Sequence, residues 1–264
     1  MIGFIGGGNM AEAIIKGFKS QGSGAKKDIL VSEPREDRRK YLEKTYYVRT
    51  TSSNREAASL CNIIILAVKP QNMAAVLNEI ADLITEDKTV VSIAAGITLS
   101  YLQSKLKTKK LIRVMPNTPA IVQEGMSVMS LCECFSDKDI SLVRDIFMAV
   151  GKVLTLPEKY MDAVTAISGS GPAFIALFIE AMIAAGEKMG LSRNNALELV
   201  IQTLIGTARL LETGMPPERL REMVTSPGGT TAAGLKTFEE KGFKNIVYDA
   251  IYAAKNRAGD LSKL

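Results

Sequence analysis

The sequence predicts an α/β fold in which a Rossmann-type doubly wound sheet is followed by an all-helical domain. In the first half, short apolar runs alternate with helical patterns, which is typical of a parallel sheet with helices on both faces. From about Asp162 onward the chain keeps helical periodicity and has no strand-length β-branched runs. We therefore expect a sheet domain over residues 1–158 and a helical domain over residues 159–264, with a hinge near residues 157–160.

The expected strands are runs that are apolar throughout, because strands of a parallel sheet are buried on both faces. These runs are residues 2–5, 29–32, 63–68, 90–93 and 111–115. Segments 126–131 and 152–156 are expected to add antiparallel edge strands. Helices are predicted between the strands near residues 9–21, 35–44, 71–84 and 99–107.

In the second half, residues 172–189 are apolar nearly all round, interrupted by Glu180 and Glu187. A helix of that composition lies in a core or a subunit interface, so we expect the helical domain to dimerise through it. Two glycines and a proline in the uncharged stretch 163–179 make it a poor membrane span. Further helices are predicted near residues 193–212, 217–224, 231–240 and 244–262.

The first strand ends in a glycine-rich turn that leads directly into a helix. Gly6, Gly8 and Ala11 occupy the three small positions of G-x-G-x-x-G/A. Gly6 permits the tight turn, Gly8 lets a pyrophosphate approach the backbone, and Ala11 lets the helix pack closely on the strand. The helix N-terminus adds unpaired N–H donors and the positive end of a dipole. This pattern predicts dinucleotide binding, and an ordinary tight turn is the structural alternative.

Composition limits the possible chemistry. The chain has no histidine, which removes the commonest general acid–base and the commonest metal ligand, so we expect no metal site. The net charge of +5 suits a small anionic ligand as well as nucleic acid, and the Lys/Arg clusters are typical of solvated helix faces. We expect neither a nucleic-acid nor a membrane partner.

The cysteines point to a reducing compartment. Cys61, Cys132 and Cys134 form no C-x-x-C pair and suggest no disulfide framework, so we expect a cytoplasmic protein. Cys61 adjoins an apolar run and is expected to be a small buried residue.

Ligands of a doubly wound sheet bind beyond the carboxyl ends of its strands. Besides the glycine-rich turn, the loops there are residues 67–70, 94–96 and 115–119. The first carries Lys69 and the last carries Asn117 and Thr118. Lys69 is equally well explained as a surface lysine, and Asn117 and Thr118 as turn formers that bond their own backbone.

Residues at the end of the second strand give conflicting indications of the cofactor. Glu33 lies about twenty residues after the fingerprint, where an acid would bond the ribose hydroxyls of NAD. Ser32, Arg35, Arg38 and Arg39 surround Glu33, and arginine there favours the 2′-phosphate of NADP. We expect NADP to be used, with NAD also accepted.

Two segments rich in glycine and hydroxyl residues precede apolar helices in the second half. Residues 168–173 are better explained by helix capping and close packing. Residues 225–231, with two glycines followed by two hydroxyls, favour a bound carboxylate.

Taken together, these residues resemble the Δ1-pyrroline-5-carboxylate reductase family over essentially the whole chain. The matching motifs are residues 4–11, 67–70, 94–96, 115–119, 168–173 and 226–231, of which the last two are the most specific. The resemblance implies NAD(P)H-dependent reduction of a cyclic imine, 1-pyrroline-5-carboxylate, to L-proline in proline biosynthesis. It also implies a homodimer formed by the helical domain and assembly of dimers into decamer-like rings.

The resemblance also implies roles for individual residues. The cofactor-binding residues are Gly6, Gly7, Gly8, Asn9, Met10, Ala11, Ser32, Arg35, Asn54, Ala67, Val68, Lys69, Pro70 and Ala95. The substrate-binding residues are Ser226, Gly229, Thr230 and Thr231, and the Thr231 hydroxyl donates or orients a proton. Met223 stands where some members have asparagine, and Thr230 where alanine is frequent. These departures bear on cofactor preference and affinity rather than on the reaction.

The chemistry is compatible with a chain that lacks histidine. An imine nitrogen is basic enough to arrive protonated, and the resulting iminium is a good hydride acceptor. The protein then mainly positions the two reactants and excludes water.

Two other functions stay open at this point. A β-hydroxyacid-dehydrogenase-like reductase would need a lysine base on the helical domain, for which Lys188 and Lys236 are candidates. A non-catalytic NADP-binding sensor would use the same fingerprint, but it would not need a second ligand site at residues 226–231.

Overall fold

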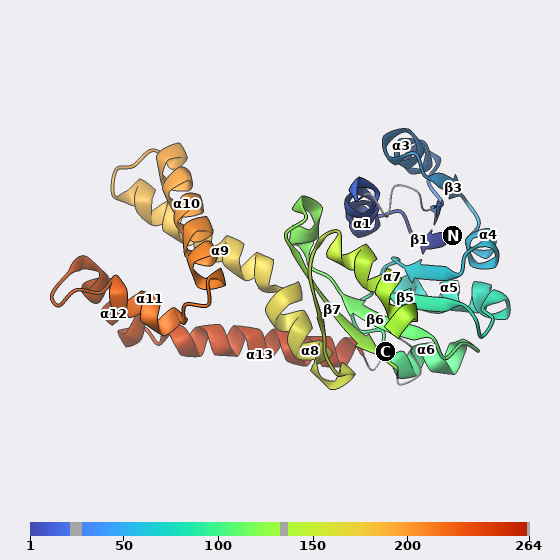
Figure 1. Ribbon diagram of the computed structural model, residues 1–264. Coiled ribbons are helices and arrows are strands. Elements are labelled where there is room, and N and C mark those ends of the chain that lie inside the picture. The colour runs from blue at the N-terminus through green and yellow to red at the C-terminus, as the bar shows by residue number, and fades with distance from the viewer. Residues whose placement is uncertain (22–27, 133–136, 263–264) are drawn as a thin grey trace. The chain divides into compact units, whose positions relative to one another are not determined.

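The computed structural model describes residues 1–21, 28–132 and 137–262 (Figure 1). Internal contacts divide the chain into two units. Unit 1 comprises Met1–Ser170 together with Ala254–Leu264, and unit 2 comprises Gly171–Ala253. The domain boundary at residues 158/159 stays a prediction, and the Cys134 side chain lies outside the described residues.

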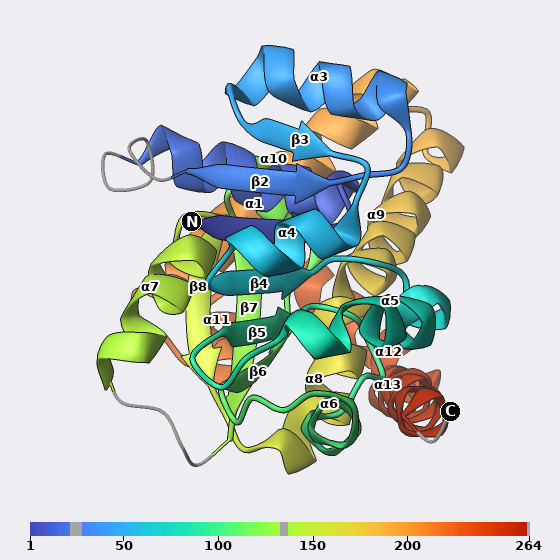
Figure 2. The same cartoon turned by 90° about the vertical axis from the view of Figure 1, so that its right-hand side faces the viewer.

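Within the described part of unit 1, an eight-stranded sheet has the order β3-β2-β1-β4-β5-β6-β7-β8 (Figure 2). The strands are β1 (Ile2–Ile5), β2 (Ile29–Ser32), β3 (Arg49–Thr51), β4 (Ile63–Leu66), β5 (Thr89–Ser92), β6 (Leu111–Met115), β7 (Gly125–Leu131) and β8 (Gly151–Thr155). The first six strands run parallel to one another. This sheet confirms the predicted doubly wound class.

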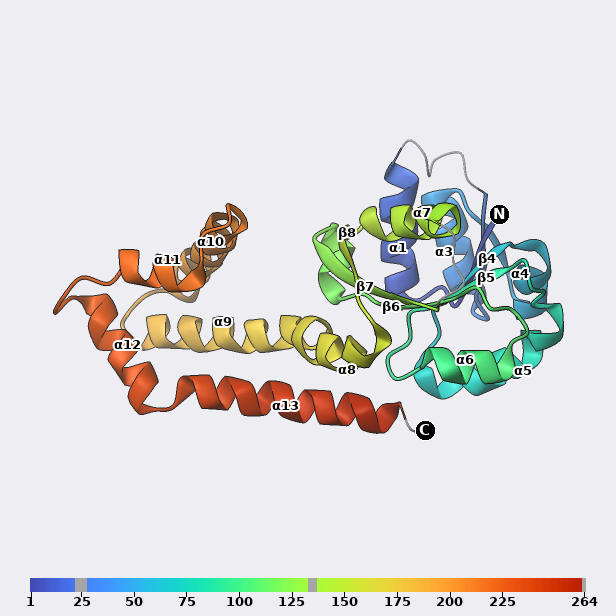
Figure 3. The same cartoon turned by 60° about the horizontal axis from the view of Figure 1, so that its bottom comes forward.

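Helices cover both faces of the sheet (Figure 3). On one face lie α1 (Asn9–Ser20), α3 (Glu36–Tyr46) and α7 (Asp137–Met148), and on the other lie α4 (Asn54–Leu60), α5 (Met73–Ile80) and α6 (Leu99–Lys105). Alternate residues of β1 serve the two cores, because Phe4 packs with the first set of helices and Ile5 with the second. Such two-sided burial explains why the parallel strands are apolar throughout.

The expectation of two antiparallel edge strands was wrong in part. β7 is antiparallel to β6, but it lies inside the sheet, and β8 pairs parallel to β7 at the edge. The reason is the connection between them: a parallel neighbour needs a crossover, and α7 supplies it.

Among the described residues, the short elements β3 and α4 were not predicted from the sequence. β3 has only three residues, all of them polar, and it pairs with β2 at the edge of the sheet. α4 begins with a detectable signal, since Ser53 Oγ accepts a hydrogen bond from the Glu56 N–H at 3.2 Å. This Ser-x-x-Glu spacing is the pattern of a capping box.

Short helical turns surround several of the longer elements. Pro70–Asn72 and Ala81–Leu83 are 3-10 turns that flank α5, so the α-helix itself is shorter than predicted. Thr118–Val122 and Glu158–Tyr160 are further 3-10 turns. α8 (Met161–Val164) continues into a π-helical turn, Thr165–Gly169, at the end of the long segment of unit 1.

Unit 2 is helical, as predicted. Its elements are α9 (Gly171–Lys188), α10 (Arg193–Glu212), α11 (Pro217–Met223), α12 (Thr230–Glu240) and α13 (Phe243–Leu261), of which the last turns belong to unit 1. Its buried cluster is small and consists of Ile183, Ala196 and Val200. Large apolar residues of α9 and α10 are exposed instead, among them Leu177 at 65% and Leu199 at 58%.

In the part of the chain that the structure describes, one helical stretch, Glu158–Lys188, is long and apolar enough to cross a membrane by length and composition. Only 11% of its most apolar window is buried within the chain. An exposed apolar surface of this extent is typical of an interaction site.

Candidate functional site

The glycine-rich turn brings the carboxyl end of β1 against two other strand ends. Gly6 has φ +100°, and a Cβ there would lie 2.7 Å from the carbonyl oxygen of Ala67. The Gly6 N–H donates to the carbonyl of Ser32 at 2.8 Å. Any side chain at position 6 would therefore be strained and would collide with the neighbouring loop.

The N-terminus of α1 opens onto free space. Gly8 is the N-cap of α1 and makes no side-chain capping bond, and no heavy atom of the described residues lies within 4 Å of a Cβ placed on it. Asn9 is exposed, whereas Met10 packs partly against the core and Ala11, also in α1, is fully buried in the core. The first N–H groups of the helix therefore face a space that can accept an anion.

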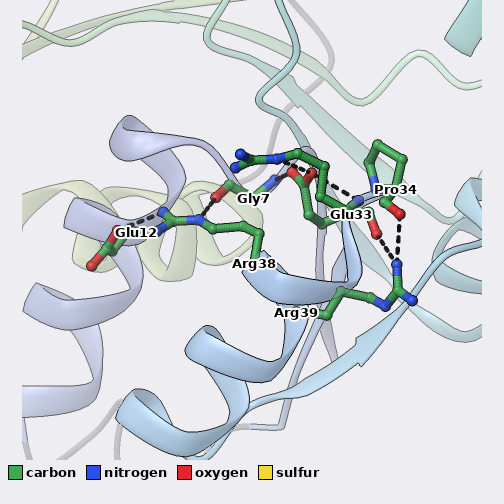
Figure 4. Close-up of polar contacts among 7 residues, drawn as sticks. Gly7, Glu12, Glu33, Pro34, Arg38 and Arg39 are labelled. Atoms are coloured by element: carbon green, nitrogen blue, oxygen red, sulfur yellow. Dashed lines mark hydrogen bonds and ion pairs between the residues drawn. The ribbon is translucent and has the colours of Figure 1, made fainter.

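The Glu33 carboxylate points inward at the end of β2 (Figure 4). Its Oε2 accepts a hydrogen bond from the Gly7 N–H at 3.0 Å. Its Oε1 accepts from the Arg35 N–H at 3.2 Å and lies 3.4 Å from the Arg35 Nε. Glu33 is only 7% exposed, so both carboxylate oxygens are engaged by the protein.

Arginines surround this carboxylate, as the sequence indicated. Arg38 Nε donates to the Gly7 carbonyl at 2.7 Å, and Arg39 Nη1 donates to the carbonyls of Glu33 and Pro34, both at 2.8 Å (Figure 4). The Arg35 side chain is 62% exposed. The region beside the glycine-rich turn is therefore rich in guanidinium groups, which bind phosphate well.

Ser32 and Asn54 lie in contact, although 22 residues separate them. Ser32 Oγ donates to Asn54 Oδ1 at 2.7 Å, and Asn54 Nδ2 donates to Glu79 Oε2 at 2.7 Å. Asn54 is the first residue of α4, a helix that sequence analysis missed. The fold thus brings Asn54 next to the other residues expected at the cofactor site.

The loops after β4 and β5 complete this edge of the sheet. Ala67 and Val68 are partly buried, whereas Lys69 and Pro70 are exposed at the start of a 3-10 turn. Ala95 is partly buried. Beside it, another part of the chain packs closely, because a Cβ on Gly96 would lie 2.9 Å from the backbone oxygen of Leu261.

Asn117 does not bond its own turn, contrary to one of the interpretations considered from the sequence. Its Oδ1 accepts from the Met126 N–H at 2.8 Å, and its Nδ2 donates to the carbonyl of Ser168 at 3.2 Å. Asn117 therefore connects the loop after β6 with the π-helical turn Thr165–Gly169. Two recognised motifs, residues 115–119 and 168–173, meet through this side chain.

In unit 2, the residues expected to bind substrate gather at the start of α12. Gly228 has φ +71°, and the Gly229 N–H donates to the Ser226 carbonyl at 3.0 Å. Gly229 is the N-cap of α12 and makes no side-chain capping bond, and Thr230 and Thr231 form the first turn. Thr230 is exposed and Thr231 is partly buried. This turn presents backbone N–H groups and two hydroxyls suited to a carboxylate.

Comparison with protein families matches both parts of the chain. Residues 158–261 match the family described as pyrroline-5-carboxylate reductase dimerisation. Residues 1–96 match the family described as NADP oxidoreductase coenzyme F420-dependent.

Individual relatives extend over the full length. The pyrroline-5-carboxylate reductase of Synechocystis sp. is 43% identical over 263 residues, which cover 99% of this chain and 98% of that protein. The Pisum sativum enzyme is 40% identical over 262 residues, which cover 99% of this chain and 96% of that protein.

Solved structures agree with this similarity. A pyrroline-5-carboxylate reductase from Coxiella burnetii has a TM-score of 0.91 at 36% identity, covering 100% of this chain and 98% of that one. The pyrroline carboxylate reductase of Plasmodium falciparum, solved with NADP bound, has a TM-score of 0.87 at 35% identity and covers 99% and 97% of the two chains. With relatives this similar along the whole length, the chain belongs to the pyrroline-5-carboxylate reductase family.

Proposed function

We propose that this protein reduces 1-pyrroline-5-carboxylate to L-proline with a hydride from NADPH, as the last step of proline biosynthesis. The observation that carries the proposal is 43% identity to a named pyrroline-5-carboxylate reductase across 99% of this chain. The open helix N-terminus at Gly8 and the glycine–threonine turn before α12 support it, because each suits one of the two anionic reactants.

The residues present fit an NADP cofactor. Residues 6–11 would hold the pyrophosphate, since Gly8 leaves open space before the N-terminus of α1. Ser32, Asn54 and the exposed Arg35 would lie toward the adenosine 2′-phosphate, and residues 67–70 with Ala95 toward the nicotinamide half. When bound, the cofactor supplies the hydride that the chain itself cannot provide. We expect NADPH to be preferred and NADH to be accepted.

The start of α12 would hold the substrate carboxylate. Backbone N–H groups of residues 229–231 would donate to its oxygens, with Ser226 shaping the turn that presents them. The Thr231 hydroxyl would orient the ring nitrogen or return a proton to it. Because the iminium form is already electrophilic, the residues mainly orient the ring and exclude water.

A hydroxyacid dehydrogenase activity has less support. Such chemistry needs a general base, and the lysine candidates are exposed on the chain. The Lys236 side chain is 77% exposed and lies 3.9 Å from a carboxylate oxygen of Glu240. A sensor role has less support because the well-formed turn at residues 226–231 would have no ligand.

The helical unit is proposed to form a homodimer. Its own buried cluster is small, whereas long apolar side chains of α9 and α10 are exposed, including Ile175 at 54% and Leu177 at 65%. An exposed apolar surface of this kind is typical of a subunit interface. We further propose that dimers assemble into rings and that the protein is cytoplasmic.

The test is steady-state turnover of purified protein. NADPH absorbance should fall when 1-pyrroline-5-carboxylate is added, and a parallel NADH series should give a lower kcat/KM. Reactions without the imine, and reactions of a 3-hydroxy acid with NADP in the opposite direction, serve as controls. Folded protein that binds NADPH but turns over only the hydroxy acid would overturn the proposal.

A further inference from the structure

An acidic residue at the end of the second strand of a dinucleotide-binding fold usually binds the adenosine ribose, where its carboxylate accepts hydrogen bonds from the hydroxyls. Glu33 occupies that place in this sequence. The environment of Glu33 in the structure differs from the one that this role requires. An acidic residue that binds the ribose must present at least one carboxylate oxygen outward, toward the ribose hydroxyls.

Protein groups engage both oxygens of Glu33. Oε2 accepts from the Gly7 N–H at 3.0 Å (Figure 4). Oε1 accepts from the Arg35 N–H at 3.2 Å. Glu33 is 7% exposed, and a Cβ placed on Gly7 would lie 3.2 Å from the Glu33 Cβ. The carboxylate is therefore packed against the turn and bonded to its backbone.

Glu33 binds the N–H of Gly7, and a second charged side chain, Arg38, binds the carbonyl of Gly7. Arg38 Nε donates to the Gly7 carbonyl at 2.7 Å, and the Arg38 guanidinium is braced by Glu12. The N–H and the C=O of Gly7 are thus both fixed by charged side chains, one at the end of β2 and the other on α3. Gly7 lies between the two glycines whose geometry the pyrophosphate site requires.

We propose that Glu33 is a positioning residue that fixes the glycine-rich turn, and not the ribose-binding acid. Rotating its carboxylate toward a ribose would leave the buried Gly7 N–H without its acceptor, a costly change. Glu33 therefore acts on the pyrophosphate site, which NADH and NADPH share. The inference rests on the proposed use of a nicotinamide dinucleotide.

The consequence is specific. Loss of the Glu33 oxygen that accepts from the Gly7 N–H should weaken the binding of both dinucleotides by the same factor. A carboxylate that bound the adenosine ribose would behave differently. Its loss would weaken the binding of NADH alone, and it would relieve repulsion of the 2′-phosphate of NADPH.

The test is direct titration of the full chain with NADPH and with NADH, followed by calorimetry or nicotinamide fluorescence. Glu33→Ala should raise both Kd values about tenfold, so that their ratio stays unchanged. Glu33→Gln keeps an oxygen that can accept from Gly7 and should stay within about threefold of the parent for both ligands. Asp82→Asn, in an exposed ion pair with Arg55, is a matched control that should change neither Kd.

Several results would overturn the proposal. One is that Glu33→Ala weakens the binding of NADH alone, and another is that it leaves the binding of both dinucleotides unchanged. A third is that Glu33→Gln weakens binding as much as Glu33→Ala does. If Glu33→Ala does not fold, as judged by circular dichroism, Glu33→Ser takes its place in the same titration and should raise both Kd values by the same factor. Because only binding is measured, the outcome is independent of whether 1-pyrroline-5-carboxylate is the substrate.

Discussion

The guanidinium of Arg38 on α3 pairs with the carboxylate of Glu12 on α1, and the same guanidinium donates to the carbonyl of Gly7. The hydroxyls of Tyr41 and Tyr46 also donate to Glu12, at 2.8 and 2.7 Å. One carboxylate therefore ties α3 to the first helix and braces the arginine that holds the glycine-rich turn. This arrangement makes Glu12 a point at which stability should depend on pH.

We expect Glu12→Gln to destabilise the protein at neutral pH but not in acid. Partial burial by itself raises the pKa of Glu12, but hydrogen bonds from Tyr46, Arg38 and Tyr41 outweigh it and lower the pKa below its ordinary 4.5. A carboxylate with a lowered pKa contributes stability above its unfolded pKa and loses it as the pH falls through the folded value.

The difference in unfolding free energy between parent and variant should be about 1 kcal/mol at pH 7 and should shrink as the pH falls below 4.5 and through the lowered pKa of folded Glu12. Urea unfolding at a series of pH values measures it. A difference that stays constant with pH would show that the Glu12 charge is not involved.

Gly8→Val should abolish NADPH binding while leaving the fold intact. A Cβ on Gly8 meets no heavy atom within 4 Å and Gly8 has φ −70°, so the protein tolerates the side chain. The added methyl groups would instead fill the space proposed for the pyrophosphate. NADPH titration and a thermal melt check the two parts, with Gly8→Ala as the milder variant. Unaltered affinity in Gly8→Val would mean that the fingerprint is only a turn.

Thr231→Ala should raise KM for the imine and lower kcat, with the NADPH Kd and the oligomeric state unchanged. The physical reason is the loss of the partly buried hydroxyl in the first turn of α12. Thr231→Ser, which retains the hydroxyl, should recover most of the activity. Thr237→Ala, at an exposed position later on the same helix, is the matched control and should leave the kinetics unchanged. Normal kinetics in Thr231→Ala would remove this residue from the proposed substrate site.

Gly17→Ala should destabilise unit 1. A Cβ on Gly17 would lie 2.4 Å from the Ala149 carbonyl oxygen and 2.7 Å from Val150 Cγ1, so α1 would have to move away from the segment after α7. Such overpacking costs about 1–3 kcal/mol. Lys16→Ala, at an exposed position on the same helix, should stay within about 0.5 kcal/mol of the parent. Urea unfolding of both variants compares them directly, and equal stabilities would contradict the packing argument.

Cys61 should be unreactive toward thiol reagents in the folded protein. It is fully buried, and burial raises the pKa of its thiol, so the reactive thiolate is scarce and inaccessible. In a labelling assay, Cys61→Ala should leave the number of reactive thiols unchanged under native conditions and reduce it by one in denaturant. A lower native count in the variant would show that Cys61 is accessible.

Local pattern predicted much of this architecture. The five apolar runs became parallel strands because each is buried between two layers of helices, and the five helices of the second half appeared within a few residues of their expected limits. Gly6 was predictable because a positive φ at that turn selects glycine. Such features depend on residues close together in the chain.

The sequence by itself determined the fold class, the turn at Gly6, the buried state of Cys61 and the family. Only the tertiary structure decided that β3 completes the edge of the sheet, that β8 runs parallel to β7, that Asn54 contacts Ser32, and that Glu33 faces Gly7 instead of solvent. Each of these depends on a partner more than fifteen residues away in the chain. A polar side chain or a short strand has several acceptable partners locally, and only the packed fold selects which of them it meets.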